Sequence, residues 1–297
     1  MPAPRPDLRA APRYWSQDTE GKIRCSLCPR RCIMPDGHTG HCGARANSGG
    51  SMVLPFFGCL SSIAVDPIEK KPLRRFMPGT RTFSTGFWGC NMDCPFCQNH
   101  EISHPAMRAT ARPEPFVSPD EFVAMALASA APSISYTYSE PCIHAEYVTA
   151  CMERAHDAGL KNILVTNGCI LSEAARDILM LTDATNVDLK CNSASTYHAI
   201  LGGELDIVQN FIRIAAKFTH VEVTTLVVPG ISDSETDIEG IARFISSVSA
   251  EIPLHITRYH PDFRMSLAPT AYPEMERIAT PAYDHLKYVY LYNPHFD

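Results

Sequence analysis

The chain has 297 residues, 45% of them hydrophobic, and a formal net charge of −6. This composition is typical of a soluble globular protein with a sizeable core. The negative charge argues against general binding to nucleic acid or anionic membranes, both of which need a positive field, and no apolar run is long enough to span a bilayer. Small molecules or proteins are therefore the expected partners.

Residues 1–20 open the chain with several arginines and prolines and no apolar core, so we expect a loose N-terminal arm. No signal-peptide pattern is recognisable there. The chain contains 12 cysteines, and seven of them fall into two tight clusters. Clustered cysteines without a secretion signal favour metal sites over disulfides and predict a reducing, cytoplasmic location.

Residues 21–79 are rich in Cys, Gly, Pro and Arg, and are expected to form a small metal-binding module with a linker. Four cysteines lie close together in a polar, Gly-rich stretch: Cys25, Cys28, Cys32 and Cys42. Structural zinc and an auxiliary iron–sulfur cluster both fit this pattern, and the C-x2-C opening favours zinc. Zinc would mainly stabilise the fold of the module, whereas an iron–sulfur cluster could relay electrons or anchor substrate.

The linker between the module and the next part carries a run of basic residues, Lys70, Lys71, Arg74 and Arg75. Charged runs usually form a solvated surface. The alternative is that this segment lies over the mouth of a barrel and selects an anionic substrate.

From residue 80 onward, short β-branched or apolar runs alternate with amphipathic stretches, which predicts β/α units and a parallel sheet. We expect strands at 82–87, 134–138, 162–166, 185–189, 220–228, 254–259 and 288–292, and helices at 122–130, 145–158 and 172–181. These units are too few for a closed eight-stranded barrel. Residues 80–297 are therefore predicted to form a partial, open parallel β/α barrel.

The first of these strands leads into a C-x3-C-x2-C motif formed by Cys90, Cys94 and Cys97. Three thiolates can hold three corners of a [4Fe-4S] cluster and leave the fourth iron open. Ordinary buried cysteines, or a zinc site completed by a distant residue, are the alternatives, but neither usually shows this spacing. The motif resembles that of the radical S-adenosylmethionine (SAM) superfamily. That resemblance implies SAM as cofactor, cleaved reductively to methionine and a 5'-deoxyadenosyl radical that abstracts hydrogen from a substrate.

The same resemblance assigns roles to polar residues at the strand ends, where α/β barrels carry their chemistry. Glu140 is expected to accept a hydrogen bond from the SAM amine, like the Glu of the superfamily's Gly-Gly-Glu segment; helix capping before Pro141 is the alternative. Phe96 either covers the adenine or packs in the core. His260, at the end of the sixth strand, is expected to face the site, whereas His255 is the more ordinary core histidine.

Two further pairs complete the expected SAM site. Lys190 could pair with the SAM carboxylate and Asp188 with ribose hydroxyls or with Lys190, although a solvated charge pair is the alternative. Thr166 and Asn167 could donate hydrogen bonds to the nucleoside, but Asn167-Gly168 is also a good turn sequence.

Longer segments resemble activating enzymes of the pyruvate formate-lyase type, and most closely the radical SAM branch named AmmeMemoRadiSam. The matching segments are Cys25 to Cys32, Asp66 to Leu73, Gly89 to Asn91, Cys97 to Asn99, Tyr136 to Pro141, Val165 to Gly168, Asn186 to Lys190, Thr224 to Gly230 and Pro253 to Arg258. The resemblance implies an open barrel and an electron donor such as flavodoxin or ferredoxin.

Three functions remain open at this point. The leading hypothesis is a SAM-cleaving enzyme that acts on a small molecule or a peptide. The alternative within the superfamily is an activating enzyme that installs a glycyl radical on a partner enzyme. A noncatalytic iron–sulfur or zinc module for binding or electron transfer is the third, but four ligands would serve it better than three.

Overall fold

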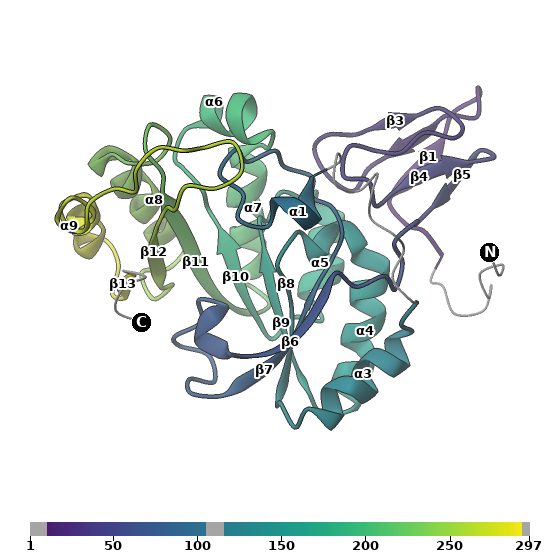
Figure 1. The fold of residues 1–297 in the computed structure, drawn as a ribbon, viewed down its shortest axis with the longest axis horizontal. Helices are drawn as coiled ribbons and strands as arrows, with labels where there is room; N and C mark the ends of the chain where they lie inside the picture. Colours follow the sequence, from purple (N-terminus) through teal and green to yellow (C-terminus); the bar gives the residue numbers. More distant parts are fainter. Residues whose placement is uncertain (1–10, 105–115, 293–297) are drawn as a thin grey trace.

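The structure is a computed structural model that describes residues 11–104 and 116–292. Its main feature is an eight-stranded sheet in the order β13-β12-β11-β10-β9-β8-β7-β6 (Figure 1). Strand β6 (Ser62–Pro67) runs antiparallel to β7 (Arg81–Gly86), and every other neighbouring pair is parallel. The remaining strands are β8 (Ser133–Thr137), β9 (Lys161–Thr166), β10 (Ala184–Asp188), β11 (His220–Val227), β12 (Leu254–Arg258) and β13 (Val289–Leu291). Because β6 and β13 are unpaired edges of the described sheet, the barrel is open, as the sequence predicts.

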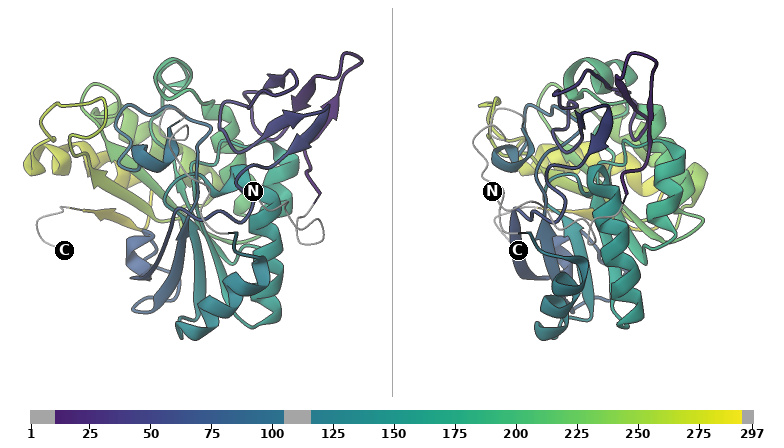
Figure 2. Two further views of the ribbon diagram at one scale, coloured as in Figure 1. Left: turned by 45° about the vertical axis from the view of Figure 1, so that its right-hand side comes forward. Right: turned by 90° about the vertical axis from the view of Figure 1, so that its right-hand side faces the viewer.

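Helices between the strands cover the outer face of the sheet (Figure 2). The longer ones are α3 (Pro119–Ala128), α4 (Ala145–Asp157), α5 (Ser172–Leu179), α7 (Leu205–Ala215), α8 (Glu235–Val248) and α9 (Tyr272–Ala279). Helix α3 begins as its sequence predicts, with Pro119 in the first turn and a capping box between Ser118 and Glu121. In the described residues no helix is both long and apolar enough to cross a membrane.

Short helical segments lie in the connections. They are η2 (Ile68–Lys70), α1 (His100–Ser103), η3 (Pro141–His144), α6 (Ala194–Thr196), η4 (Tyr197–Leu201) and η5 (Thr280–Asp284). Of these, α1 follows the C-x3-C-x2-C motif directly, so the three cysteines lie in the loop from β7 to α1.

The N-terminal part consists of small antiparallel strands that stand beside α4 and α5 (Figure 1). They are β1 (Trp15–Gln17), β2 (Ile23–Cys25), β3 (Ile33–Met34), β4 (Ala46–Ser48) and β5 (Ser51–Val53). Strand β1 pairs with β2, so ordered structure begins inside the arm that the sequence suggested for residues 1–20, of which 1–10 lie outside the described residues. Strand β6 belongs to the barrel sheet, which therefore begins before residue 80.

The basic linker lies at the opposite end of the sheet from the strand ends that carry the motif residues. The backbone N–H groups of Arg74 and Arg75 donate to Glu222, near the beginning of β11, at 3.0 and 2.8 Å. Asn186 Nδ2 donates to the Pro72 carbonyl at 2.8 Å. Lys71 is only 1% exposed. The alternative of a segment over the barrel mouth is therefore wrong, since the linker closes the amino-terminal end of the sheet.

Candidate functional site: the three-cysteine loop and the strand ends

The three cysteines of the β7–α1 loop are held in place by backbone and side-chain hydrogen bonds. Gly89, which precedes the first of them, has a φ of 97°, a conformation that favours glycine and turns the chain out of β7. Cys90 Sγ accepts hydrogen bonds from Met92 N at 3.4 Å and from Asn167 Nδ2 at 3.6 Å. Cys94 is buried, and Cys97 is partly exposed.

Burial makes these thiols poor acids on their own. It raises the pKa of Cys94 to about 11, and it raises the pKa values of Cys90 and Cys97 as well. Thiolates here need compensating positive charge, which iron supplies when it displaces the protons. Three soft thiol donors on one tight loop fit three corners of an iron–sulfur cluster, in which each thiolate binds a different iron.

Lys190 places a positive charge near Cys94 of the cysteine loop. Its Nζ lies 3.0 Å from Asp188 Oδ2, just after β10, and its side chain is 16% exposed. Burial lowers the pKa of Lys190, but the nearby Asp188 carboxylate and Cys94 raise it by more, so the net shift is upward. The structure therefore brings Lys190 and Asp188 together beside Cys94, and the pair is not the solvated surface pair that the sequence left open.

Glu140 differs from the expectation of an exposed ligand for the SAM amine. Its side chain is fully buried, and both oxygens are in use: Thr166 Oγ1 donates to Oε1 at 2.7 Å and Asn167 N to Oε2 at 2.8 Å. Oε1 also accepts from Cys142 N at 3.0 Å, at the start of η3. The carboxylate thus holds the turn after β9 in position, and the capping alternative describes it better.

Asn167 connects that turn to the cysteine loop. Its Nδ2 donates to Asn91 Oδ1 at 2.9 Å, and its Oδ1 accepts from Cys169 N at 2.8 Å. Asn91 Nδ2 in turn donates to the Cys169 carbonyl at 2.7 Å. Asn91 was missed as a functional residue, although it directly follows the first cysteine of the motif. Two asparagines therefore fix the β7 and β9 loops against each other.

Phe96 and His260 have different surroundings. Phe96 is 4% exposed and belongs to the main hydrophobic core, which supports its core-packing interpretation. His260 follows β12 and is partly buried. Its loop reaches the cysteine motif a few residues later, where Arg264 N donates to the Pro95 carbonyl at 3.0 Å. His255 is buried and lies 2.6 Å from Glu222 Oε2, as expected for a core histidine.

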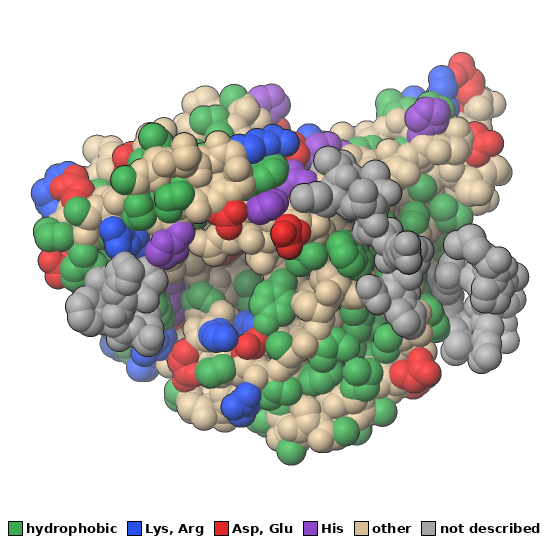
Figure 3. Space-filling view, viewed as in Figure 1, with side chains coloured by type: hydrophobic (Ala, Val, Ile, Leu, Met, Phe, Trp, Pro, Cys, Tyr) green, Lys and Arg blue, Asp and Glu red, His purple; other side chains and the backbone are tan. Residues whose placement is uncertain are grey.

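The inner side of the sheet is polar. The ring of Phe83 in β7 lies 5.5 Å from that of Phe122 in α3, so its neighbours in the strand face away from the helices. On that inner side Thr82 Oγ1 lies 2.7 Å from Ser135 Oγ. Figure 3 shows this face of the molecule hollowed below the loops, with basic, acidic and histidine side chains around the hollow.

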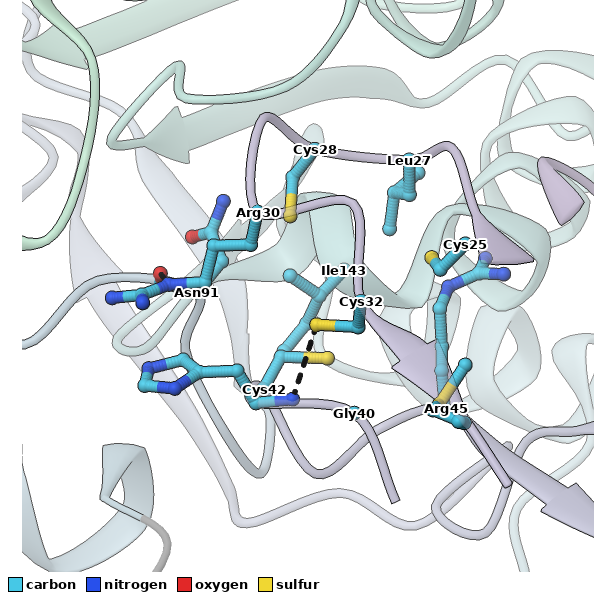
Figure 4. Close-up of a pocket in the computed structure, with 12 residues that line it drawn as sticks. Cys25, Leu27, Cys28, Arg30, Cys32, Gly40, Cys42, Arg45, Asn91 and Ile143 are labelled. Carbon is cyan, nitrogen blue, oxygen red and sulfur yellow. Dashed lines mark hydrogen bonds between the residues drawn. The ribbon is translucent and has the colours of Figure 1, made fainter. Parts of the chain in front are cut away.

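The N-terminal cysteines surround a separate cavity between the module and the barrel (Figure 4). Two residues of its rim contact Asp93 of the cysteine loop: Arg30 forms an ion pair with it, and His41 Nε2 lies 3.1 Å from its Oδ1. Arg30 Nε also donates to the Asn91 carbonyl at 2.6 Å. These contacts could not be predicted from the sequence, because they join segments far apart in the chain.

Comparison with known proteins places these features in context. The family model described as "Radical SAM superfamily" matches residues 87–245. An uncharacterised protein of Methanocaldococcus jannaschii is 36% identical over 96% of this chain and 85% of its own length. The 7-carboxy-7-deazaguanine synthase of Thermococcus kodakarensis is 31% identical over 62% of this chain and 76% of its own. Pyruvate formate-lyase 1-activating enzyme of Escherichia coli is 23% identical over 62% and 75%, respectively.

Proposed function

The chain belongs to the radical SAM superfamily, and from that premise we propose that Cys90, Cys94 and Cys97 hold the [4Fe-4S] cluster at which SAM binds. When bound, the cluster supplies the electron for reductive cleavage of SAM and so for hydrogen abstraction from a substrate. The observation that carries the proposal is the convergence of Lys190 and Asn167 on this loop, beside Cys94 and Cys90.

Each of these residues has a task that its contacts support. Lys190 offsets the negative charge of the thiolates and presents an ammonium group to the SAM carboxylate. Asp188, held 3.0 Å from Lys190, keeps this ammonium oriented and accepts from ribose hydroxyls. Asn167 donates to the Cys90 sulfur, and Glu140 fixes the turn that carries Asn167 and Thr166. In this proposal Glu140 is a positioning residue and not a direct SAM ligand.

We propose a small molecule or a peptide as the substrate. Support comes from the polar inner side of the sheet, where Thr224 Oγ1 donates to Asn186 Oδ1 at 2.8 Å. Such groups recognise polar atoms of a ligand. The relative from Thermococcus kodakarensis is named for a small-molecule product, which agrees with this class.

The test is product formation by the full chain after anaerobic reconstitution. With SAM and dithionite, the protein should form 5'-deoxyadenosine and methionine, detected by mass spectrometry, and flavodoxin or ferredoxin should replace dithionite. Cys94→Ala should abolish the products. Cys151→Ala, which removes a buried thiol from α4, is the matched control and should retain them. If the fully cluster-loaded protein does not cleave SAM, even with cell extract added, the proposal is wrong.

Installation of a glycyl radical on a partner enzyme is the second candidate, and the similarity to pyruvate formate-lyase 1-activating enzyme supports it. Its test is an electron paramagnetic resonance (EPR) signal of a glycyl radical on an enzyme encoded beside this one. A protein that cleaves SAM but leaves such an enzyme without the signal does not have this function. Membership of the AmmeMemoRadiSam branch stays a prediction.

A further inference from the structure

Four cysteines of the N-terminal module line one small cavity. Cys25 ends β2, Cys28 and Cys32 lie in the turn to β3, and Cys42 lies in the loop to β4. The cavity has a volume of about 10 Å³ and is also lined by Leu27, Arg30, Met34, Gly40, His41, Arg45, Asn91 and Ile143. Figure 4 shows the cysteine side chains arranged around this space.

The cavity between these cysteines is larger than a single zinc ion needs. A zinc ion held by four thiolates lies about 2.3 Å from each sulfur, which leaves no space for a water between them. The cavity here has about the size that encloses one water. In the part of the chain that the structure describes, no three Cys, His, Asp or Glu side chains are arranged to hold one metal ion. The cavity therefore leaves room for a group larger than one metal ion.

Arg45 supplies an independent sign of a ligand. It is 1% exposed, and its other nitrogens are satisfied: Nη1 donates to the Arg13 carbonyl at 2.9 Å and Nη2 to both oxygens of Glu146 at 2.6 Å. Its Nε is buried without a hydrogen-bond partner. Buried donors of this kind are rarely left unpaired, so a partner is expected in the cavity that Arg45 lines.

We propose that Cys25, Cys28, Cys32 and Cys42 bind a [4Fe-4S] cluster through all four irons, and that Arg45 Nε donates a hydrogen bond to one of its sulfurs. Four thiolates are a complete ligand set, so this cluster has no open iron for SAM. The zinc favoured by the C-x2-C opening is replaced by a cluster in this account. The proposal does not depend on SAM cleavage.

Metal analysis of the full-length chain with Cys90, Cys94 and Cys97 all replaced by Ala isolates this site. After anaerobic reconstitution with iron and sulfide, the variant should retain about four irons and four sulfides per chain, with a [4Fe-4S] Mössbauer spectrum. Adding Cys28→Ala and Cys42→Ala should remove this iron, whereas adding Cys151→Ala should not. Stoichiometric zinc without iron, or no retained metal, overturns the proposal.

Arg45→Lys in the same background tests the hydrogen bond. Lysine keeps the positive charge opposite Glu146 but lacks the Nε–H group. The variant should retain its iron and show a lower reduction potential, because hydrogen bonds to cluster sulfurs favour the reduced state. An unchanged potential at full iron content would contradict the role of Arg45, and circular dichroism checks that the fold is kept.

Discussion

Lys190 carries the only side-chain ammonium that the described contacts place against the three-cysteine loop, where it lies between Asp188 and Cys94. A buried cation held by a neighbouring carboxylate is well placed to bind a second carboxylate from a ligand. In the proposed site, the position of Lys190 therefore determines how strongly the carboxylate of SAM is held.

Lys190→Met should weaken SAM binding to the cluster-loaded protein by about tenfold or more, since hydrogen bonds to charged groups contribute roughly 1.5–3 kcal/mol. Calorimetric titration with SAM under anaerobic conditions measures this. The matched control is Lys161→Met, which removes an ion-paired lysine 2.8 Å from Asp183 at the beginning of β9. Equal affinities for both variants would argue against the role of Lys190.

At the level of single residues, the candidate site residues could be predicted from the sequence, but most of their hydrogen-bond partners could not. Cys90, Cys94 and Cys97 are recognisable because their spacing is local, and the roles proposed for Lys190 and Asp188 rest on their place at a strand end. The burial of Glu140 could not be predicted, because it depends on the backbone N–H of Asn167, 27 residues away. Asn91 contacts Asn167 and Cys169, which are 76 and 78 residues away in the chain.

At the scale of elements, the seven strands expected from residue 80 onward are confirmed to within about two residues, because β-branched runs between helices mark buried parallel strands. Strand β6 was missed since Ser62–Pro67 lies in a segment dominated by turn residues, and its partner β7 comes only after a long connection. That connection carries basic residues that looked like a solvated run. Its packing against Glu222 is visible only in three dimensions.

The contact between the linker and the sheet should depend on pH. Burial raises the pKa of Glu222, but hydrogen bonds from His220, His255 and the Arg74 backbone lower it by more, to about 2 from 4.5. A depressed carboxyl pKa adds stability above the unfolded value of 4.5, and this stability is lost as the pH falls from there towards 2.

Urea unfolding of the wild type and of Glu222→Gln between pH 6 and 2 measures the stability that the Glu222 carboxylate contributes. The wild type should be clearly more stable at pH 6, and the difference between the two proteins should shrink below about pH 4.5. Glu251→Gln serves as a comparison at an exposed ion pair with Lys287. A difference between wild type and Glu222→Gln that stays constant over this range would show that the charge of Glu222 contributes nothing.

The loop after η4 holds the contact between Arg30 and Asp93 in place. Gly202 has a φ of 64°, and a Cβ there would collide with Arg30 Nη2 and lie 2.8 Å from Asp93 Oδ2. Gly230 has a similar φ of 74° but no atom within 4 Å of the Cβ position. Both Ala variants should lose about 1–2 kcal/mol from backbone strain, and Gly202→Ala up to about 1 kcal/mol more, because Arg30 must move away from Asp93 and weaken their ion pair. Chemical denaturation compares them, and equal losses would rule out the clash.

At the scale of the whole molecule, the N-terminal module and the barrel form one unit. Arg45 of the module and Glu146 of α4 make a buried ion pair, and Tyr14 donates to Asp177 of α5 at 2.7 Å. The family model begins only at residue 87, so the module and β6 lie outside the matched region. What the module binds therefore has to be inferred from its own residues.

The buried ion pair between Arg45 and Glu146 allows the interaction between the N-terminal module and the barrel to be measured. Arg45→Met leaves the Glu146 carboxylate buried without a counter-charge and should cost about 3–5 kcal/mol. Adding Glu146→Leu should recover much of that loss, because the double variant buries no charge. Stability from urea unfolding of the metal-free proteins gives the double-mutant cycle. A double variant whose losses simply add would show that the two side chains do not interact.

The most direct test of the central claim, an open iron held by Cys90, Cys94 and Cys97, is electron–nuclear double resonance of the reduced protein with SAM labelled with ¹⁵N in its amine and ¹⁷O in its carboxylate. Couplings from both labels to the cluster spin are expected in the wild type and in the Cys28→Ala, Cys42→Ala variant. Cluster-loaded protein that binds SAM without either coupling would contradict it.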